Sequence, residues 1–103
     1  MNPNAVNQIT QLLSQAGSAH HVFEQTVLKG VYDQEWPAWY AQYVIEHGLN
    51  DVLGRPVTVE QLSRFLAENY EVYKKENPNQ GWADYTGQQI LAHWPMPEKT
   101  ARA

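Results

Sequence analysis

His20, His21 and Glu24 are the side chains in this sequence whose types and spacing best suit metal binding. Positions four apart share one face of a helix, so His20 and Glu24 could both reach one metal ion. A catalytic zinc site normally uses three protein ligands, and His47 or His93 would have to supply the third from another helix. In the alternative, His20 and Glu24 form a solvated pair, since both fall largely outside the apolar stripe of their helix. We expect the exposed pair, and we predict no metal site and no cofactor.

His47 and His93 each stand at the predicted end of a helix. A protonated imidazole there interacts favourably with the exposed backbone carbonyls, by about 0.3–1 kcal/mol. General acid–base catalysis would require a nearby carboxylate, such as Glu46 or Asp84, and a pocket. The sequence contains no nucleophile elbow, phosphate loop or dinucleotide-binding fingerprint. We therefore predict a non-enzymatic protein without catalytic residues.

Aromatic side chains are the unusual feature of the composition, with four Trp, six Tyr and two Phe. Large rings are hard to bury completely in 103 residues, and rings left at a surface are favoured anchors for protein partners or ring-shaped ligands. The predicted interaction surface contains Trp36, Trp39, Tyr40, Tyr43, Trp82 and Tyr85. Trp36 and Trp82 are the first candidates for this surface because both stand at the predicted starts of helices. Tyr70 and Tyr73 form a second candidate group. The alternative is that these rings belong to the core.

Charge and composition exclude several classes of partner. With seven basic and eleven acidic side chains, the net charge of −4 would repel a nucleic-acid backbone, and the largest basic cluster is Lys74–Lys75. The absence of cysteine excludes disulfides and thiolate metal ligands. No apolar run approaches the roughly 20 residues that cross a bilayer, and the polar start Met1–Asn4 lacks the pattern of a secretory signal. We expect a soluble, cytoplasmic protein that binds neither nucleic acid nor membrane.

Apolar residues recur at helical spacing along the chain, which predicts an all-α fold. A chain of this length forms one core, so we expect a compact bundle of about five short helices in a single domain over residues 1–94. Pro95 and Pro97 prevent further helix, and residues 95–103 are predicted to form a flexible tail. The predicted helices cover residues 5–16, 18–29, 33–48, 58–76 and 81–93.

Glycine and capping residues set the expected boundaries. Gly17 should end the first helix, Ser18 should cap the second, and Gly30 should terminate it in a left-handed conformation. Asp33 should cap the third helix, and residues 50–56 have the composition of a connecting loop. The inner face of the second helix is predicted to contain Val22, Phe23, Thr26 and Val27.

The fourth helix has the clearest start in the sequence. Thr58 to Gln61 fits a capping box, and Val57 and Leu62 are placed to close over it as a hydrophobic staple. The helix should end before Asn77.

A shift of 46 positions places Trp82–His93 against Trp36–His47, with Trp, Gln and His coinciding. The match suggests two helical hairpins related by an approximate twofold axis, although two similar amphipathic helices could converge on the same pattern. Ala41 and Gly87 are equivalent under this shift. Because small residues allow close approach, we expect the third and fifth helices to form the central pair.

The segment Trp36-Pro-x-Trp-Tyr-Ala-x-Tyr-Val-Ile-x-His-Gly48 resembles a signature of small uncharacterised all-helical proteins, chiefly bacterial. The resemblance extends through the fourth helix and Gly81–Tyr85, about two-thirds of the chain. It implies a helical fold and brings no activity, ligand or partner.

These observations favour a small interaction or regulatory module that associates with itself or with another protein through an aromatic surface. The alternative is a protein that binds a small molecule or a metal, and that could be an enzyme. Its pocket would lie between the second, third and fifth helices and would use His20, Glu24, His47 or His93.

Overall fold

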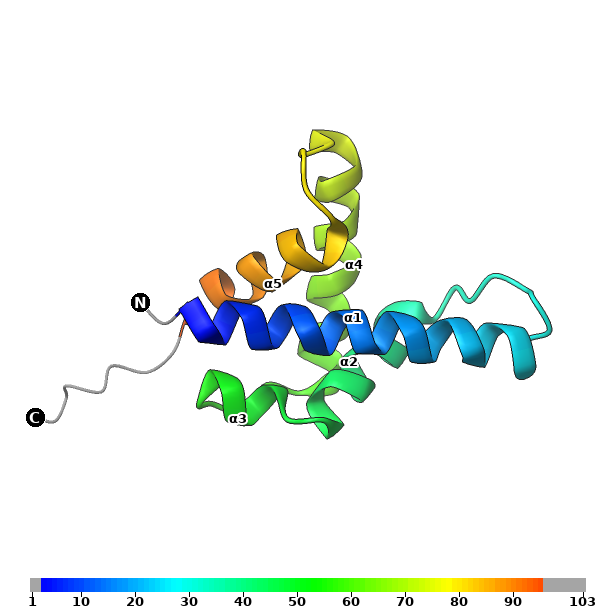
Figure 1. The fold of residues 1–103 in the computed structure, drawn as a ribbon, viewed down its shortest axis with the longest axis horizontal. Coiled ribbons are helices and arrows are strands. Elements are labelled where there is room, and N and C mark those ends of the chain that lie inside the picture. Colours follow the sequence, from blue (N-terminus) through cyan, green and yellow to red (C-terminus); the bar gives the residue numbers. More distant parts are fainter. Residues whose placement is uncertain (1–2, 96–103) are drawn as a thin grey trace, which may run out of the picture.

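The computed structural model describes residues 3–95 and consists of helices joined by short segments (Figure 1). The helices are α1 (Pro3–Thr26), α2 (Trp36–Glu46), α3 (Leu49–Leu53), α4 (Val59–Glu76) and α5 (Trp82–His93). Residues 3–95 contain no β-strand, and the all-α fold class is confirmed. Apart from Pro95, the tail predicted for residues 95–103 lies outside the described residues. Among the described helices, none combines the length and the apolar character needed to cross a membrane.

The prediction that Gly17 ends a helix is wrong, because α1 continues through Gly17 and Ser18 without a break. The buried face of α1 keeps helical spacing across the glycine and consists of Ala5, Ile9, Leu13, Ala16 and His20. Gly17 lies against α2, since a Cβ at this position would stand 3.4 Å from the Tyr40 hydroxyl. Glycine costs a helix interior about 1 kcal/mol, and burial of the neighbouring side chains offsets this cost.

The last turns of α1 project past the other helices, at the right of Figure 1. For this reason Val22 and Val27, which were predicted to face inward, are exposed. From the predicted inner face, Phe23 packs against two rings, those of Trp39 at 5.6 Å and His20 at 5.9 Å between centroids. Gly30 has the expected left-handed conformation, with φ of 86°, although α1 already ends at Thr26.

The segment predicted as a loop at residues 50–56 begins with a helix, α3. Gly48 and Gly54 bracket this helix in left-handed conformations, with φ of 109° and 72°. Leu49 and Leu53 lie four positions apart and are completely buried. The loop prediction is wrong because it was based on the polar residues of this segment. The two leucines, which pack into the core, stabilise the helix.

The start of α4 is confirmed in detail. The Thr58 hydroxyl accepts a hydrogen bond from the Gln61 backbone N–H at 3.0 Å, and the Gln61 side chain accepts one from the Thr58 N–H at 3.1 Å. Val57 and Leu62, the two members of the staple, are both buried. The helix ends at Glu76, before Asn77, as predicted.

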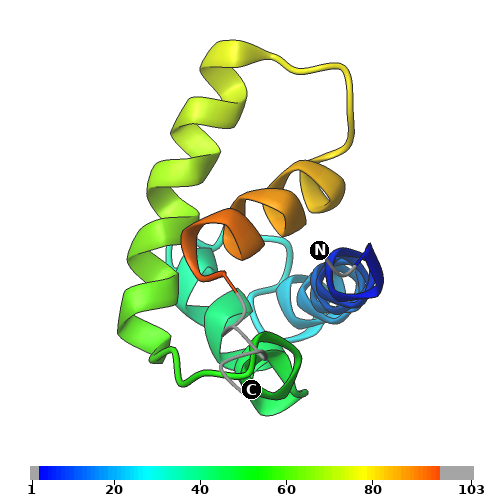
Figure 2. The same ribbon diagram turned by 90° about the vertical axis from the view of Figure 1, so that its left-hand side faces the viewer.

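The most extensive helix contacts join α2 to α4 and α1 to α5 (Figure 2). The expectation that the third and fifth predicted helices form the central pair is wrong: among the described residues, α2 and α5 meet at the rings near their starts and do not pack along their lengths. Gly87 permits close approach to α1 instead, because a Cβ on it would stand 2.7 Å from the Thr10 hydroxyl. Thr10 lies outside the proposed repeat, and the duplication stays a prediction.

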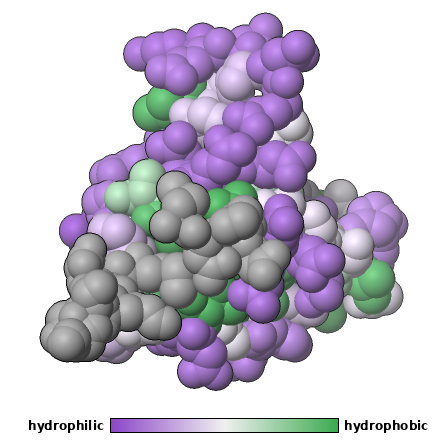
Figure 3. All heavy atoms as spheres, turned by 60° about the vertical axis from the view of Figure 1, so that its left-hand side comes forward, coloured by the Kyte–Doolittle hydropathy of each residue, from purple (hydrophilic) through white to green (hydrophobic). Residues whose placement is uncertain are grey.

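A buried hydrogen bond joins α4 to α5 within this packing, from the Asn69 side-chain amide to the Thr86 hydroxyl at 3.0 Å. Beyond this contact α4 continues into solvent, and hydrophilic residues cover its projecting end (Figure 3). The apolar packing is therefore confined to the region where the helices cross.

Candidate functional site

An open pocket of about 220 Å³ lies where α1, α2, α4 and α5 converge with the segment between α1 and α2. Its lining residues are His20, Glu24, Tyr32, Trp36, Tyr40, Tyr70 and Trp82. Most of these side chains are aromatic, and Glu24 contributes a carboxylate. The pocket thus combines ring walls with one acidic group.

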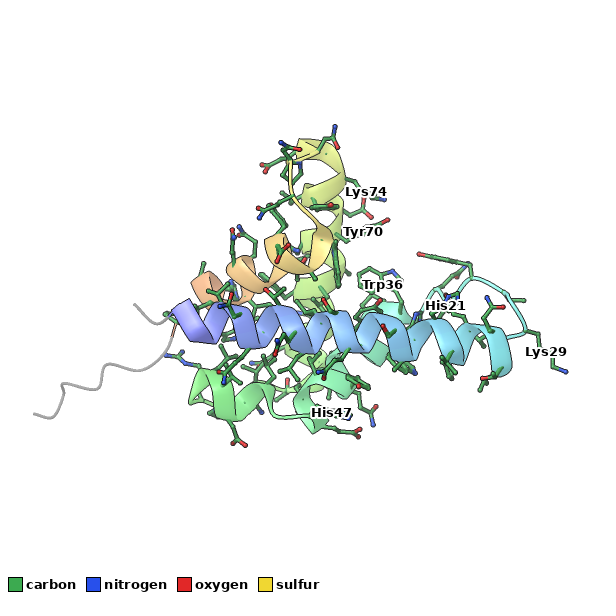
Figure 4. The ribbon with its side chains drawn as sticks, in the orientation of Figure 1. His21, Lys29, Trp36, His47, Tyr70 and Lys74 are labelled. Carbon is green, nitrogen blue, oxygen red and sulfur yellow. The ribbon has the colours of Figure 1, made fainter. Side chains whose placement is uncertain are left out.

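Trp36 is the centre of the aromatic wall. Its ring meets those of Tyr40, Tyr70 and Trp82 at centroid distances of 5.5, 5.4 and 5.9 Å, all close to perpendicular. Tyr40 and Trp82 also meet edge-on, at 5.4 Å. Such pairs contribute about 0.5–1.5 kcal/mol each beyond the area that they bury, so these contacts hold the wall in place. In Figure 4, Trp36 and Tyr70 point into the same region beside α1.

His20 forms the back of the pocket and is buried. Its Nε2 donates a hydrogen bond to Oδ2 of Asp33 at 2.8 Å, because an ionised carboxylate only accepts. Asp33 is buried as well and accepts a second bond from the Glu35 backbone N–H at 2.9 Å. The prediction of an exposed His20 is therefore wrong. Asp33, expected to cap a helix, instead ties the segment after α1 back onto α1, and the cap position of α2 falls to Glu35.

Glu24 lies one helical turn after His20, with Oε2 3.9 Å from Nδ1 of the imidazole. Its side chain keeps partial access to solvent. Burial and then the negative charge of Glu24 raise the pKa of Tyr40 above its ordinary value. The carboxylate of Glu24 therefore lies close enough to the Tyr40 hydroxyl to act on it electrostatically.

Trp82 has an unusual position in the wall. Its indole N–H is buried and has no hydrogen-bond acceptor among the described residues. Leaving a buried donor unpaired costs about 1–3 kcal/mol. The contacts with Trp36 and Tyr40 thus hold the Trp82 ring in the wall, although its N–H loses its hydrogen bond to water there.

The predicted aromatic surface divides between three places. Trp36, Tyr40 and Trp82 line the pocket, together with Tyr70 from the second predicted group. Trp39 and Tyr43 stack on each other at 5.5 Å outside the pocket, and Tyr85 is buried.

The remaining predicted metal candidates are not brought to the pocket. His47 donates from Nδ1 to the Tyr43 carbonyl at 2.7 Å at the end of α2, and His93 packs on Phe65 at 4.9 Å. His21 is exposed on α1. Across residues 3–95, no three or more His, Asp or Glu side chains are placed to hold a metal ion.

Sequence reasoning missed two residues of this site, Tyr32 and Asp33. The signal that could have found Asp33 is the buried stripe of α1, which reaches His20 at unbroken helical spacing and so demands a buried polar partner. Tyr32 lies in a segment without periodicity, and no sequence signal marks it.

Comparison with protein-family models, with curated proteins and with solved structures finds no match to this chain. The family resemblance drawn from the Trp36–Gly48 segment therefore stays a prediction.

Proposed function

We propose that the protein is a non-enzymatic interaction module whose aromatic pocket receives a side chain from a partner protein. The first support is size. Sites for small molecules commonly enclose about 300–1,000 Å³, and this pocket of about 220 Å³ is smaller. A single protruding side chain suits that volume better than a whole metabolite.

The second support is the apolar surface next to the pocket. Val22, Val27, Val31 and Tyr32 are 57–67% exposed on the projecting end of α1 and the segment that follows it. We call this group the apolar tip. Tyr32 belongs both to the apolar tip and to the lining of the pocket. This shared, exposed ring carries the proposal, because exposed aromatic side chains are favoured anchors in protein interfaces.

The alternative of a small-molecule site with enzymatic chemistry has one observation in its favour, the carboxylate-held imidazole of His20. Asp33 occupies Nε2 and Glu24 faces Nδ1. Both ring nitrogens of His20 thus face carboxylates of the chain itself. The interaction module is therefore the stronger proposal.

Affinity capture from the native cells, with matched surface variants, tests the proposal. Val27→Ser with Val31→Ser alters the apolar tip, and Val72→Ser alters an exposed valine on α4 as the control. We expect a partner that the wild type and the control retain and the tip variant loses, and whose purified form binds the purified protein directly. Light scattering separates self-association from binding to another protein. If the tip variant recovers the same proteins as the wild type and all forms stay monomeric, the proposal is wrong.

The cytoplasmic location expected from the sequence forms part of this proposal. Fractionation of the native cells checks it.

A further inference from the structure

We propose that the pocket binds the methylated ammonium group of a lysine side chain on the partner protein, between the aromatic wall and the carboxylate of Glu24. This inference rests on the proposed function and adds the chemistry of the group that is recognised.

The aromatic wall supplies the first part of such a site. A cation within about 6 Å of a ring centroid is attracted by the negative face of the ring, and Trp is the most effective ring. Trp36, Tyr40, Tyr70 and Trp82 line one pocket, and their mutual contacts at 5.4–5.9 Å fix them relative to one another. A ligand cation placed there lies near several rings at once.

Charge complementarity supplies the second part. The residues that line the pocket include Glu24 and no Lys or Arg. The carboxylate of Glu24 is close enough to raise the pKa of Tyr40. The chain as a whole has a net charge of −4. The charges on the pocket therefore favour a positive ligand and disfavour an anion.

The chain already places one of its own ammonium groups on this cluster. Lys74 Nζ stands 4.7 Å from the centroid of the Tyr70 ring and 3.3 Å from Glu71 Oε2. Lys74 itself does not line the pocket. The Lys74 contact is the arrangement that we infer for the partner, a cation over a ring with a carboxylate beside it.

We infer methylation from the large apolar area of the rings that line the pocket. An unmodified ammonium carries three N–H donors, each of which loses water on entering the pocket. The walls are mostly rings, and Glu24 is the carboxylate among the lining residues. Methyl groups remove those donors, keep the positive charge and add apolar surface that packs on the rings. A trimethylated lysine is thus matched to this pocket better than an unmodified one.

The test is a titration followed by the NMR signals of the indole N–H groups. The probes are the blocked amino acid amides of trimethyllysine, of lysine, and of the neutral analogue in which carbon replaces the charged nitrogen. We expect trimethyllysine to shift the signals of Trp36 and Trp82, and the neutral analogue to bind on the order of tenfold more weakly. Unmodified lysine should also bind more weakly than trimethyllysine.

Variants of the protein separate the contribution of the Glu24 charge from that of the shape of the pocket. Glu24→Gln keeps the size of the side chain and should weaken trimethyllysine about fivefold while leaving the neutral analogue unchanged. Glu68→Gln, an exposed carboxamide substitution on α4, is the matched control and should bind like the wild type. Circular dichroism of each variant verifies the fold, and Trp36→Phe provides a second, conservative probe of the rings.

Each other outcome overturns the inference. Equal binding of the neutral analogue would show that the pocket takes an apolar tip, and absence of any indole shift would show that it takes none of these groups. Tighter binding of choline than of trimethyllysine would assign the pocket to a free small molecule. The apolar-tip variants test the proposed function separately, so a partner captured through the tip with no cation in the pocket leaves that function standing.

Discussion

The Nε2–H of His20 donates to Oδ2 of Asp33 across 2.8 Å, and the two side chains are thirteen positions apart in the sequence. This buried bond connects α1 to the segment that leads into α2. Because Tyr32 precedes Asp33, the bond also fixes one wall of the pocket.

Asp33→Ala should destabilise the fold by about 1–3 kcal/mol, because it leaves the buried His20 N–H without an acceptor. It also removes the bond to the Glu35 amide. Urea unfolding followed by tryptophan fluorescence measures the change. Glu68→Ala, on the exposed face of α4, is the control and should change the stability by less than about 0.5 kcal/mol. Equal stability of the two variants would mean that the bond between His20 and Asp33 contributes nothing.

Gly17→Ala and Gly87→Ala should have opposite effects. A Cβ at Gly17 meets the Tyr40 hydroxyl at an ordinary 3.4 Å, so alanine should stabilise the helix by about 0.5–1 kcal/mol. A Cβ at Gly87 would stand 2.7 Å from the Thr10 hydroxyl and 3.4 Å from the Thr10 backbone nitrogen, so this variant should be less stable than the wild type. Thermal unfolding monitored by circular dichroism compares them, and a destabilised Gly17→Ala would argue against a continuous α1.

Leu53→Ala should cost about 2–5 kcal/mol, because the side chain is completely buried and its removal leaves a cavity. The neighbouring Asp51→Ala is exposed and should have little effect. Chemical unfolding of both variants tests whether α3 belongs to the core. A small loss for Leu53→Ala would restore the prediction of a loose loop at this place.

Stability above pH 10 should depend on Tyr40. Burial and the charge of Glu24 raise the pKa of Tyr40 above its ordinary value of 10.0 in the folded chain. Above pH 10 the folded state therefore holds this proton more firmly than the unfolded state, and the free energy of unfolding falls as the pH rises through the folded pKa. Below pH 10 the proton is bound in both states and this dependence vanishes.

The measurement is urea unfolding of the wild type and of Tyr40→Phe as a function of pH. The wild type should lose stability more steeply than Tyr40→Phe above pH 10, whereas the difference between them should be constant near neutral pH. Parallel curves over the whole alkaline range would contradict the raised pKa.

Short-range patterns in the sequence determined much of the secondary structure. The capping box at Thr58–Gln61 and the left-handed Gly30 depend on contacts within a few residues, so the sequence predicts them correctly. The same holds for the start of α5 at Trp82 and its end at His93. Trp36 and Trp82, chosen for their type and their places at helix entrances, line the pocket together with Tyr40, and their role as an interaction surface stays a prediction.

Tertiary structure alone decided the continuity of α1, the helix α3 and the pocket. Gly17 favours a helix end when only its own propensity is considered, and the packing of Ala16 and His20 on both sides overrides that preference. The pocket joins residues from α1, α2, α4 and α5. Its assembly depends on which helices pack together, and local periodicity holds no information about that choice because a helix can bury its apolar face against any neighbour of suitable shape.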